Sequence, residues 1–164
     1  MKKISTIASI FLFLCTLFSY GQNIKSLSEK TMVENVVYQY HKYWINGEYE
    51  KMIDLLCKST IKSIVDGIIA TDKKYPEEKI INKIEEYYGK SINNISSNDI
   101  ALYVYKYIVQ KTPMKDIVDI RINNSSIIGN RAVVRYSFLF VDGRIIDPGS
   151  MKLIKEENNW KILN

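Results

Sequence analysis

Apolar residues in the first half of the chain recur every three or four positions, which predicts a series of amphipathic helices. The first spans residues 32–46, ends at an Asn-Gly pair, and is followed by a short helix over 48–56 with acids in its first turn. Similar spacing predicts helices over 61–70 and 76–88, the last starting at a proline and stopping before a glycine. The inner face of the first helix carries Val33, Val37, Tyr40 and Trp44.

The stretch from Asp99 to Lys111 fits two structures. Its apolar positions follow a helical stripe, whereas Tyr103, Tyr105 and Tyr107 alternate as in a strand. The acid at its start and the base near its end suit a helix dipole, so the pattern favours helix, with strand as the alternative. A helix would spread the three tyrosines around its axis, and an exposed tyrosine group is typical of a partner surface.

After Pro113 the apolar period changes to two, which predicts β-strands. One strand has Val118, Ile120 and Ile122 on a single face, a second covers 131–141, and the last covers 160–163. Turns are expected at 129–130, 142–143 and 157–159, and Asp147-Pro148-Gly149 has turn composition. The inward face of the second strand carries Ala132, Val134, Tyr136, Phe138 and Phe140.

This order of elements predicts an α+β fold, with the N-terminal helices packed on the concave face of a curved antiparallel sheet of about four strands. Helices come first and strands afterwards, without the alternation that a parallel sheet requires. No repeat or low-complexity linker interrupts residues 22–164, which are therefore expected to form a single domain.

The first 21 residues read as a secretory signal peptide. Lys2 and Lys3 precede a largely apolar run over 7–18, and small residues at positions 19 and 21 suit cleavage before Gln22. A transmembrane anchor is the alternative, but the run is shorter than the roughly 20 residues that span a bilayer. Cys15 lies inside the run rather than at its end, which argues against a lipoprotein. The sequence thus predicts export to the periplasm or the cell exterior, without a membrane span in the mature chain.

Charge and cysteine content narrow the function classes. Removing Lys2 and Lys3 leaves 21 basic and 18 acidic residues, a net charge of +3, with the two signs interleaved along the chain. This pattern excludes a dedicated nucleic-acid binder. Cys57 alone remains in the mature chain, so no intramolecular disulfide can form, and it is expected to be a buried thiol. One histidine and one cysteine cannot build a zinc site, and no cofactor motif is present, so no metal or cofactor is predicted.

Several of these features together resemble the nuclear-transport-factor-2-like superfamily, whose fold belongs with the cystatin-like cones. The resemblance rests on a long helix closing at Asn46-Gly47, the following Glu48-Tyr49-x-x-Met52-x-x-Leu55, the strand opening Gly129-Asn130-Arg131-Ala132-x-Val134, and Asp142-Gly143 and Trp160-Lys161-Ile162. It covers nearly the whole mature chain and is similar to small secreted members of undefined role. It implies a cone of helices against a curved sheet, often enclosing a pocket. The helical stretch 61–110 exceeds that of shorter members and could fill or cover such a pocket.

Enzymes of the superfamily, which include isomerases and dehydratases, use an aspartate or histidine inside the cone as general base. His41 lies at the edge of the first helix's apolar stripe and has an ordinary pKa suited to proton transfer. Asp54 lies between apolar residues of the second helix, where it could reach a pocket mouth or mark the solvent edge. Asp119 shares a strand face with Arg121 and is expected to form an exposed charge pair. No local spacing brings these groups together.

The aromatic residues give the predicted ligand site. Tyr40 and Trp44 of the first helix face the same interior as Tyr136 and Phe138 of the second long strand, with Trp160 opening the last strand. Such a lining could hold a small apolar ligand, or the rings could simply fill the core. The sequence therefore favours a secreted, non-catalytic binding or accessory domain. The alternative is a small pocket enzyme of isomerase or dehydratase type using His41 or an aspartate.

The second long strand also predicts self-association. Its outward positions mix Val133, Leu139 and Val141 with Arg131 and Arg135. A face this apolar suits a protein contact, and the proteins that this chain resembles commonly pair through their sheets. A homodimer, or another protein partner on this face, is therefore expected.

Overall fold

The computed structural model describes residues 28–108 and 116–163. The N-terminal helix spans residues 28–46, and a second, helical segment leads from it to the sheet. This segment contains α2 (Tyr49–Ile53), α3 (Lys58–Lys74), η1 (Pro76–Glu78), α4 (Ile80–Tyr88), η2 (Ile92–Asn94), α5 (Ser97–Tyr103) and the π-helical turn η3 (Val104–Ile108). The strands follow as β1 (Ile117–Ile128), β2 (Arg131–Phe140), β3 (Ile145–Glu156) and β4 (Asn159–Leu163).

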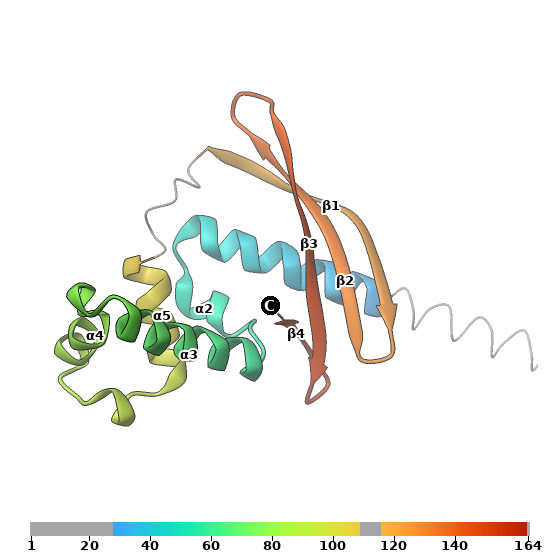
Figure 1. The fold of residues 1–164 in the computed structure, drawn as a ribbon. Helices are drawn as coiled ribbons and strands as arrows, with labels where there is room; N and C mark the ends of the chain where they lie inside the picture. Colours follow the sequence, from blue (N-terminus) through green and yellow to red (C-terminus); the bar gives the residue numbers. More distant parts are fainter. Residues whose placement is uncertain (1–27, 109–115, 164) are drawn as a thin grey trace, which may run out of the picture.

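The four strands form one antiparallel meander in the order β1-β2-β3-β4. The sheet twists strongly, and the N-terminal helix lies across one of its faces, with α2 to α5 gathered at one end (Figure 1). The α+β prediction is confirmed, including the helices on the concave side of a curved four-stranded sheet. Its physical basis is the change of apolar period from about 3.6 to two along the chain.

The main hydrophobic core lies between the N-terminal helix and the concave face of the sheet, and we call it the cone core. The helix contributes Val33, Val37 and Tyr40, and α2 adds Met52. From the sheet come inward-facing side chains of every strand, among them Val134, Leu153 and Ile162, which are fully buried. The predicted inner faces of the first helix and of β2 therefore meet as expected.

A second, smaller cluster lies within the helical segment, and we call it the helical lobe. Its buried members are Ile84, Ile95 and Ile100, from α4, the η2–α5 link and α5. Partly buried side chains of α3 and α4, including Val65, pack around them. The extra helices of the stretch 61–110 thus build a separate core beside the cone.

Several helices begin or end at residues other than the predicted ones, because the local backbone conformation sets their boundaries. The helix predicted over 61–70 is longer at both ends and forms α3 from Lys58 to Lys74. Pro76 begins the 3-10 turn η1 instead of a full helix. Lys79 adopts a left-handed conformation with φ of 48°, so α4 starts afresh at Ile80. Gly89, also left-handed, ends α4 as predicted.

Two strand predictions need correction. Val118 is exposed because a register shift between Ile117 and Asp119 turns it outward, and Ile117 takes the buried position. Residues 147–149 do not turn the chain between elements, because they lie within β3, where the pairing with β2 is irregular. The turn at 129–130 has the predicted two residues, whereas the predicted 142–143 turn is part of a longer connection over 141–144.

The ambiguous stretch is helical in the part that the structure describes. It forms α5 and continues as η3, and residues 109–111 lie outside the described residues. Tyr107 is exposed, as expected when a helix carries three tyrosines. The signal peptide also lies outside the described residues. No helix within residues 28–108 and 116–163 is long and apolar enough to cross a membrane.

Candidate functional site

His41 lies at the centre of the aromatic side of the cone core. Its ring centroid is 4.4 Å from that of Tyr136 and 5.0 Å from that of Phe138, with Tyr40 at 5.3 Å and Trp44 at 6.2 Å. The four predicted ligand-binding residues therefore meet in space, as the sequence pattern requires. The imidazole of His41 stands among them.

The surroundings of His41 set its protonation. The side chain is 2% exposed, and neither ring nitrogen has a hydrogen-bond partner among the described residues. Burial lowers the pKa of His41 to about 4, because the charged imidazolium would lose its hydration without gaining a counter-ion. At neutral pH the ring is uncharged and a weak base. A general base also needs hydrogen-bond reach to its substrate, which this packing does not offer.

The other members of the cluster are anchored by packing. Burial raises the pKa of Tyr40 well above its usual range, and its hydroxyl lies 3.4 Å from that of Tyr105. Burial also raises the pKa of Tyr136. The indole nitrogen of Trp160, elsewhere in the same core, is buried and bonds to none of the residues that the structure describes. The predicted ligand role of Tyr40, Trp44, Tyr136 and Phe138 stays a prediction.

A groove lies instead where the helical segment joins the edge of the sheet. The link between α2 and α3 pairs with β4: Leu56 forms a parallel bridge with Ile162, whose N–H donates to the Leu55 carbonyl at 2.8 Å. The Cys57 N–H donates back to the Ile162 carbonyl at 2.9 Å. These bonds fix the helices against β4, and the groove opens between them.

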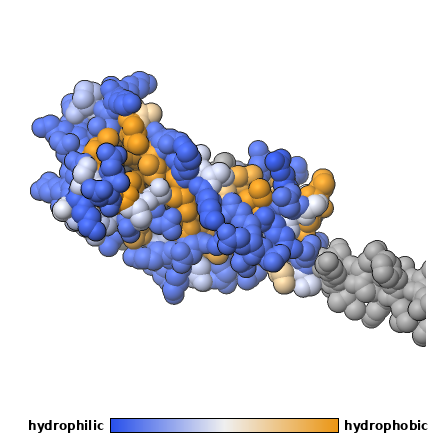
Figure 2. Space-filling model, turned by 90° about the horizontal axis from the view of Figure 1, so that it is seen from below, coloured by the Kyte–Doolittle hydropathy of each residue, from blue (hydrophilic) through white to orange (hydrophobic). Residues whose placement is uncertain are grey.

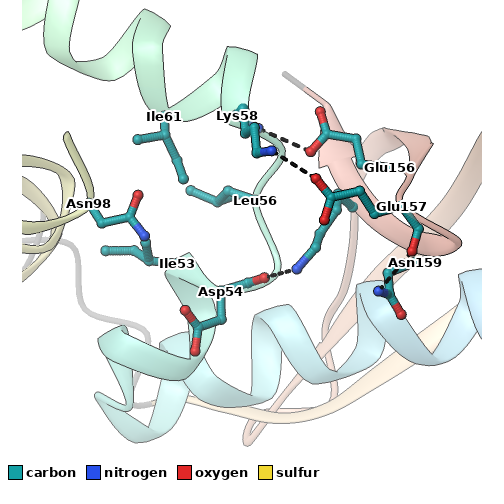
Figure 3. A pocket seen from close by; sticks show the side chains of 10 residues that line it. Ile53, Asp54, Leu56, Lys58, Ile61, Asn98, Glu156, Glu157 and Asn159 are labelled. Atoms are coloured by element: carbon teal, nitrogen blue, oxygen red, sulfur yellow. Dashed lines mark hydrogen bonds and ion pairs between the residues drawn. The ribbon is translucent and has the colours of Figure 1, made fainter. Parts of the chain in front are cut away.

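The groove has a volume of about 310 Å³ and combines an apolar floor with a charged rim (Figure 3). Ile53, Leu56 and Ile61 supply the floor, each largely buried by the core beneath. Its rim residues come from the C-terminal cap of α2, from α3 and α5, and from the hairpin of β3 and β4. They are Asp54, Lys58, Asn98, Glu156, Glu157, Asn159 and Lys161.

Both lysines of the rim have partners. Lys58 Nζ lies 2.9 Å from Glu157 Oε1, and the Lys58 N–H donates to Glu156 at 3.4 Å. Lys161 Nζ donates to the backbone carbonyl of Asp54 (Figure 3). The Asp54 carboxylate is left facing solvent at one end of the groove.

A smaller hollow of about 170 Å³ continues the groove between α2 and α5. It shares Ile53, Asp54 and Asn98 with the first and adds Glu50, Asp99 and Leu102. Five carboxylates therefore line the two hollows, against the two lysines. The groove as a whole is acidic.

Asp54 and Asp119 are both exposed, at the end of α2 and on β1. Asp54 follows α2, at its exposed C-terminal cap, so it marks the solvent edge of the helix and also borders the groove. Asp119 is exposed on β1, where its carboxylate accepts the Ile120 N–H at 2.8 Å. It forms no ion pair with Arg121, so the expected charge pair is wrong: the carboxylate bonds to the neighbouring backbone instead. Neither carboxylate lies among the residues around His41.

Cys57 is buried, as expected, and is the N-cap residue of α3. Its sulfur lies 3.1 Å from both Ser59 Oγ and Thr60 Oγ1. Burial raises the pKa of the thiol, but the hydrogen bonds with Ser59 and Thr60 outweigh it and leave the pKa below its usual value. No group of three or more His, Cys, Asp or Glu side chains gathers as a metal site within the described parts of the chain.

Sequence reasoning flagged Asp54 but missed the groove. Its rim draws on segments more than 100 residues apart, such as Asp54 and Lys161, and the sequence reads Glu156 and Glu157 only as solvated charges. The parallel bridge between Leu56 and Ile162 brings them together, and a single bridge leaves no periodic signal. The sequence around Asp54 and around Lys161 therefore gives no sign that the two segments form a groove.

No family model matches the chain, and no curated protein matches it in sequence. Among solved structures, the chain is similar to a Campylobacter jejuni protein proposed to be an NTF2-like transpeptidase. The two are 16% identical with a TM-score of 0.45, over 80% of this chain and 96% of the other. A likeness this distant assigns neither family nor activity, so the fold class rests on the helices and strands themselves.

Proposed function

We propose that this protein is an exported, non-catalytic binding domain, and that its ligand site is the groove between α2, α5 and the β3–β4 turn. The groove carries the proposal because it joins an apolar floor to polar groups that converge on it, the usual composition of a ligand site. The cone interior, where the superfamily places its catalytic bases, is occupied by the packed rings around His41.

The burial pattern supports the non-catalytic form. Of the described residues, the buried polar side chains are those of His41, Thr60 and Ser137, and no buried carboxylate accompanies the imidazole. A low pKa and ring nitrogens that bond to no described residue leave His41 without the partner that orients a catalytic base. The isomerase or dehydratase alternative is therefore the weaker one.

The lining indicates what the groove binds. Ile53, Leu56 and Ile61 favour an apolar group, and the excess of carboxylates favours a cationic one. A basic peptide segment with neighbouring leucine-type side chains has both properties. Its ammonium group would lie near Asp54, whose carboxylate makes no ion pair within the described residues.

A peptide titration tests this site. Acetyl-Lys-Leu-Leu-Lys-amide is expected to bind, and the same peptide with both lysines acetylated is expected to bind more weakly, because it lacks the charges. Asp54→Asn should weaken the basic peptide about two- to fivefold, the effect of one exposed charge pair. The matched control is Glu77→Gln, which removes an exposed acid far from the groove in the sequence and leaves affinity unchanged. Equal binding of both peptides, or equal loss in both variants, would contradict the site.

Export is the second part of the proposal. Mass spectrometry of the protein from its own cells should find a chain beginning at Gln22 or within a residue or two of it. An intact Met1 in the exported protein would contradict this part alone. Pairing through the sheet, the expectation drawn from β2, is not included here, because the charges of that face point to a different partner.

A further inference from the structure

No described helix covers the face of the sheet opposite the N-terminal helix. All described helices lie on the concave side (Figure 1), and the β2 side chains alternate between exposed and buried from Arg131 to Tyr136. Val133 is 38% exposed on this outer face, and Ile128, at the end of β1, is 82% exposed. Figure 2, which views the molecule from below, also shows apolar atoms reaching the surface at this end, beside the grey segment.

Basic side chains dominate the middle of this outer face. They are Arg121 of β1, Arg131 and Arg135 of β2, and Lys152 of β3, all exposed. The strand register places each of them opposite a neutral residue: Arg121 faces Ser137, Arg131 faces Ile128 and Ile154, Arg135 faces Asn124 and Ser150, and Lys152 faces Val133. Arg131, Arg135 and Lys152 therefore lie around Val133, and Arg121 extends the group along the strands towards Ser137. We call these four cations the basic sheet face.

No acid neutralises the basic sheet face. None of its four cations takes part in an ion pair or side-chain hydrogen bond with the described residues. All 18 Asp and Glu residues of the chain lie within the described residues, so no acidic side chain is hidden elsewhere. Asp119, two positions from Arg121 on β1, accepts the Ile120 N–H instead.

We propose that the basic sheet face docks an acidic segment of another protein. Three of its four cations are arginines, whose planar guanidinium binds carboxylates through paired hydrogen bonds and is enriched at protein interfaces. Along β2, Val133 separates Arg131 from Arg135, so the matching surface alternates carboxylates with apolar side chains. The positive charge of this face therefore favours a partner segment that carries carboxylates.

The same observations disfavour two other occupants. A second copy docked symmetrically would place like charges against each other across the two-fold axis, which opposes association. Binding to a membrane surface combines attraction to anionic lipids with apolar area that enters the bilayer, and here the cations interrupt the apolar positions along β2, so no continuous apolar area is available.

The test uses protein purified after expression of the full-length gene, with acetyl-Glu-Val-Glu-Val-Glu-amide as the probe. Wild type is expected to bind it more weakly as salt rises, since the contact is electrostatic. The double variant Arg131→Gln/Arg135→Gln should lose roughly tenfold in affinity. The control Lys73→Gln/Lys74→Gln removes two exposed cations from the end of α3 and should bind as wild type does. Unchanged thermal melting shows that both variants are folded.

A second double variant, Arg121→Gln/Lys152→Gln, covers the case in which the first fails to fold, and it should also weaken the peptide. Absence of peptide binding by the folded wild type, or equal loss in the α3 control, overturns the proposal. So does binding to phosphatidylglycerol vesicles without binding to the peptide, which would assign the face to a membrane. A sedimenting dimer that Arg131→Gln/Arg135→Gln disrupts would assign it to a second copy. Basic peptide in the groove gives an independent readout, because neither double variant touches the groove.

Discussion

The cone core and the helical lobe both bury aliphatic side chains, yet they do so on very different scales. Nineteen buried residues of the described chain belong to the cone core, and three belong to the helical lobe. The cone core is bounded by a sheet whose strands pair along their length. The lobe consists of short helices joined by 3-10 turns. The same residue types therefore give a rigid layer in one region and a small satellite core in the other.

The helical lobe buries few apolar side chains, and side-chain hydrogen bonds connect its short helices. The Tyr88 hydroxyl donates to the Asp99 carbonyl at 2.9 Å, and the Ile92 N–H donates to the Glu85 carboxylate at 2.8 Å. Such bonds contribute about 1 kcal/mol each, less than a fully buried aliphatic side chain. The lobe should consequently open before the sheet does, and the groove lies where the two regions meet.

The largest effect is expected in the cone core. Leu153 is fully buried on β3, so Leu153→Ala should lower the free energy of unfolding by about 3 to 5 kcal/mol. Chemical denaturation should show one transition shifted as a whole, because the sheet belongs to a single cooperative unit. Lys152→Ala, the exposed neighbour, is the control and should change stability little. A loss below about 1 kcal/mol for Leu153→Ala would mean that the cone core is loosely packed.

The next effect distinguishes His41 from the other rings of the cone core. Its folded pKa of about 4 lies below the ordinary 6.5, so the unfolded chain takes up the proton first as pH falls. Stability from His41 is present above about pH 6.5 and is lost as pH falls towards 4, by about 3 kcal/mol.

The variant His41→Phe keeps an aromatic ring and has no proton to bind. Its free energy of unfolding should therefore fall less steeply than that of wild type between pH 6.5 and 4, when both are measured by urea denaturation. Equal slopes in the two proteins would place His41 in water and contradict the packed cluster.

A smaller and local effect is expected in the helical lobe. Ile84 is fully buried on α4, and Ile84→Ala should reduce the local opening free energy of α4 by about 2 kcal/mol. Hydrogen exchange should show faster exchange of α4 amides, with β2 amides unchanged. Equal acceleration in α4 and β2 would mean that lobe and cone unfold together, and the contrast between them would fail.

Periodicity predicted the elements of both regions but not their junction. The helical stripe through Val37 and the alternation through Val134 led directly to the two layers of the cone core. Periodicity could not show that His41 is buried in the cone core, because a residue at the edge of the apolar stripe can also lie at the surface. Val118 was misplaced for a related reason: one extra residue in β1 reverses every side chain before it, and periodicity alone does not reveal where a bulge lies.

The candidate site was predictable only in part. Asp54 was identified from its position on the second helix, and the aromatic group from its shared faces. The groove depends on the pairing of the α2–α3 link with β4 and on the cap of α5, where Ser96 and Asp99 hydrogen-bond reciprocally. The pairing joins segments more than 100 residues apart and leaves no local pattern, and the α5 cap, although local, does not show which elements lie beside α5.

Methyl NMR of the protein with acetyl-Lys-Leu-Leu-Lys-amide tests most directly whether the groove is the ligand site. Isoleucine, leucine and valine methyl groups report on both regions in one experiment. The account predicts the largest shift changes at Ile53, Ile61 and Leu102, which line the groove, and small ones at Val37 and Val134 inside the cone core. The largest changes at Val37 and Val134 would contradict it, because they would place the ligand among the rings around His41.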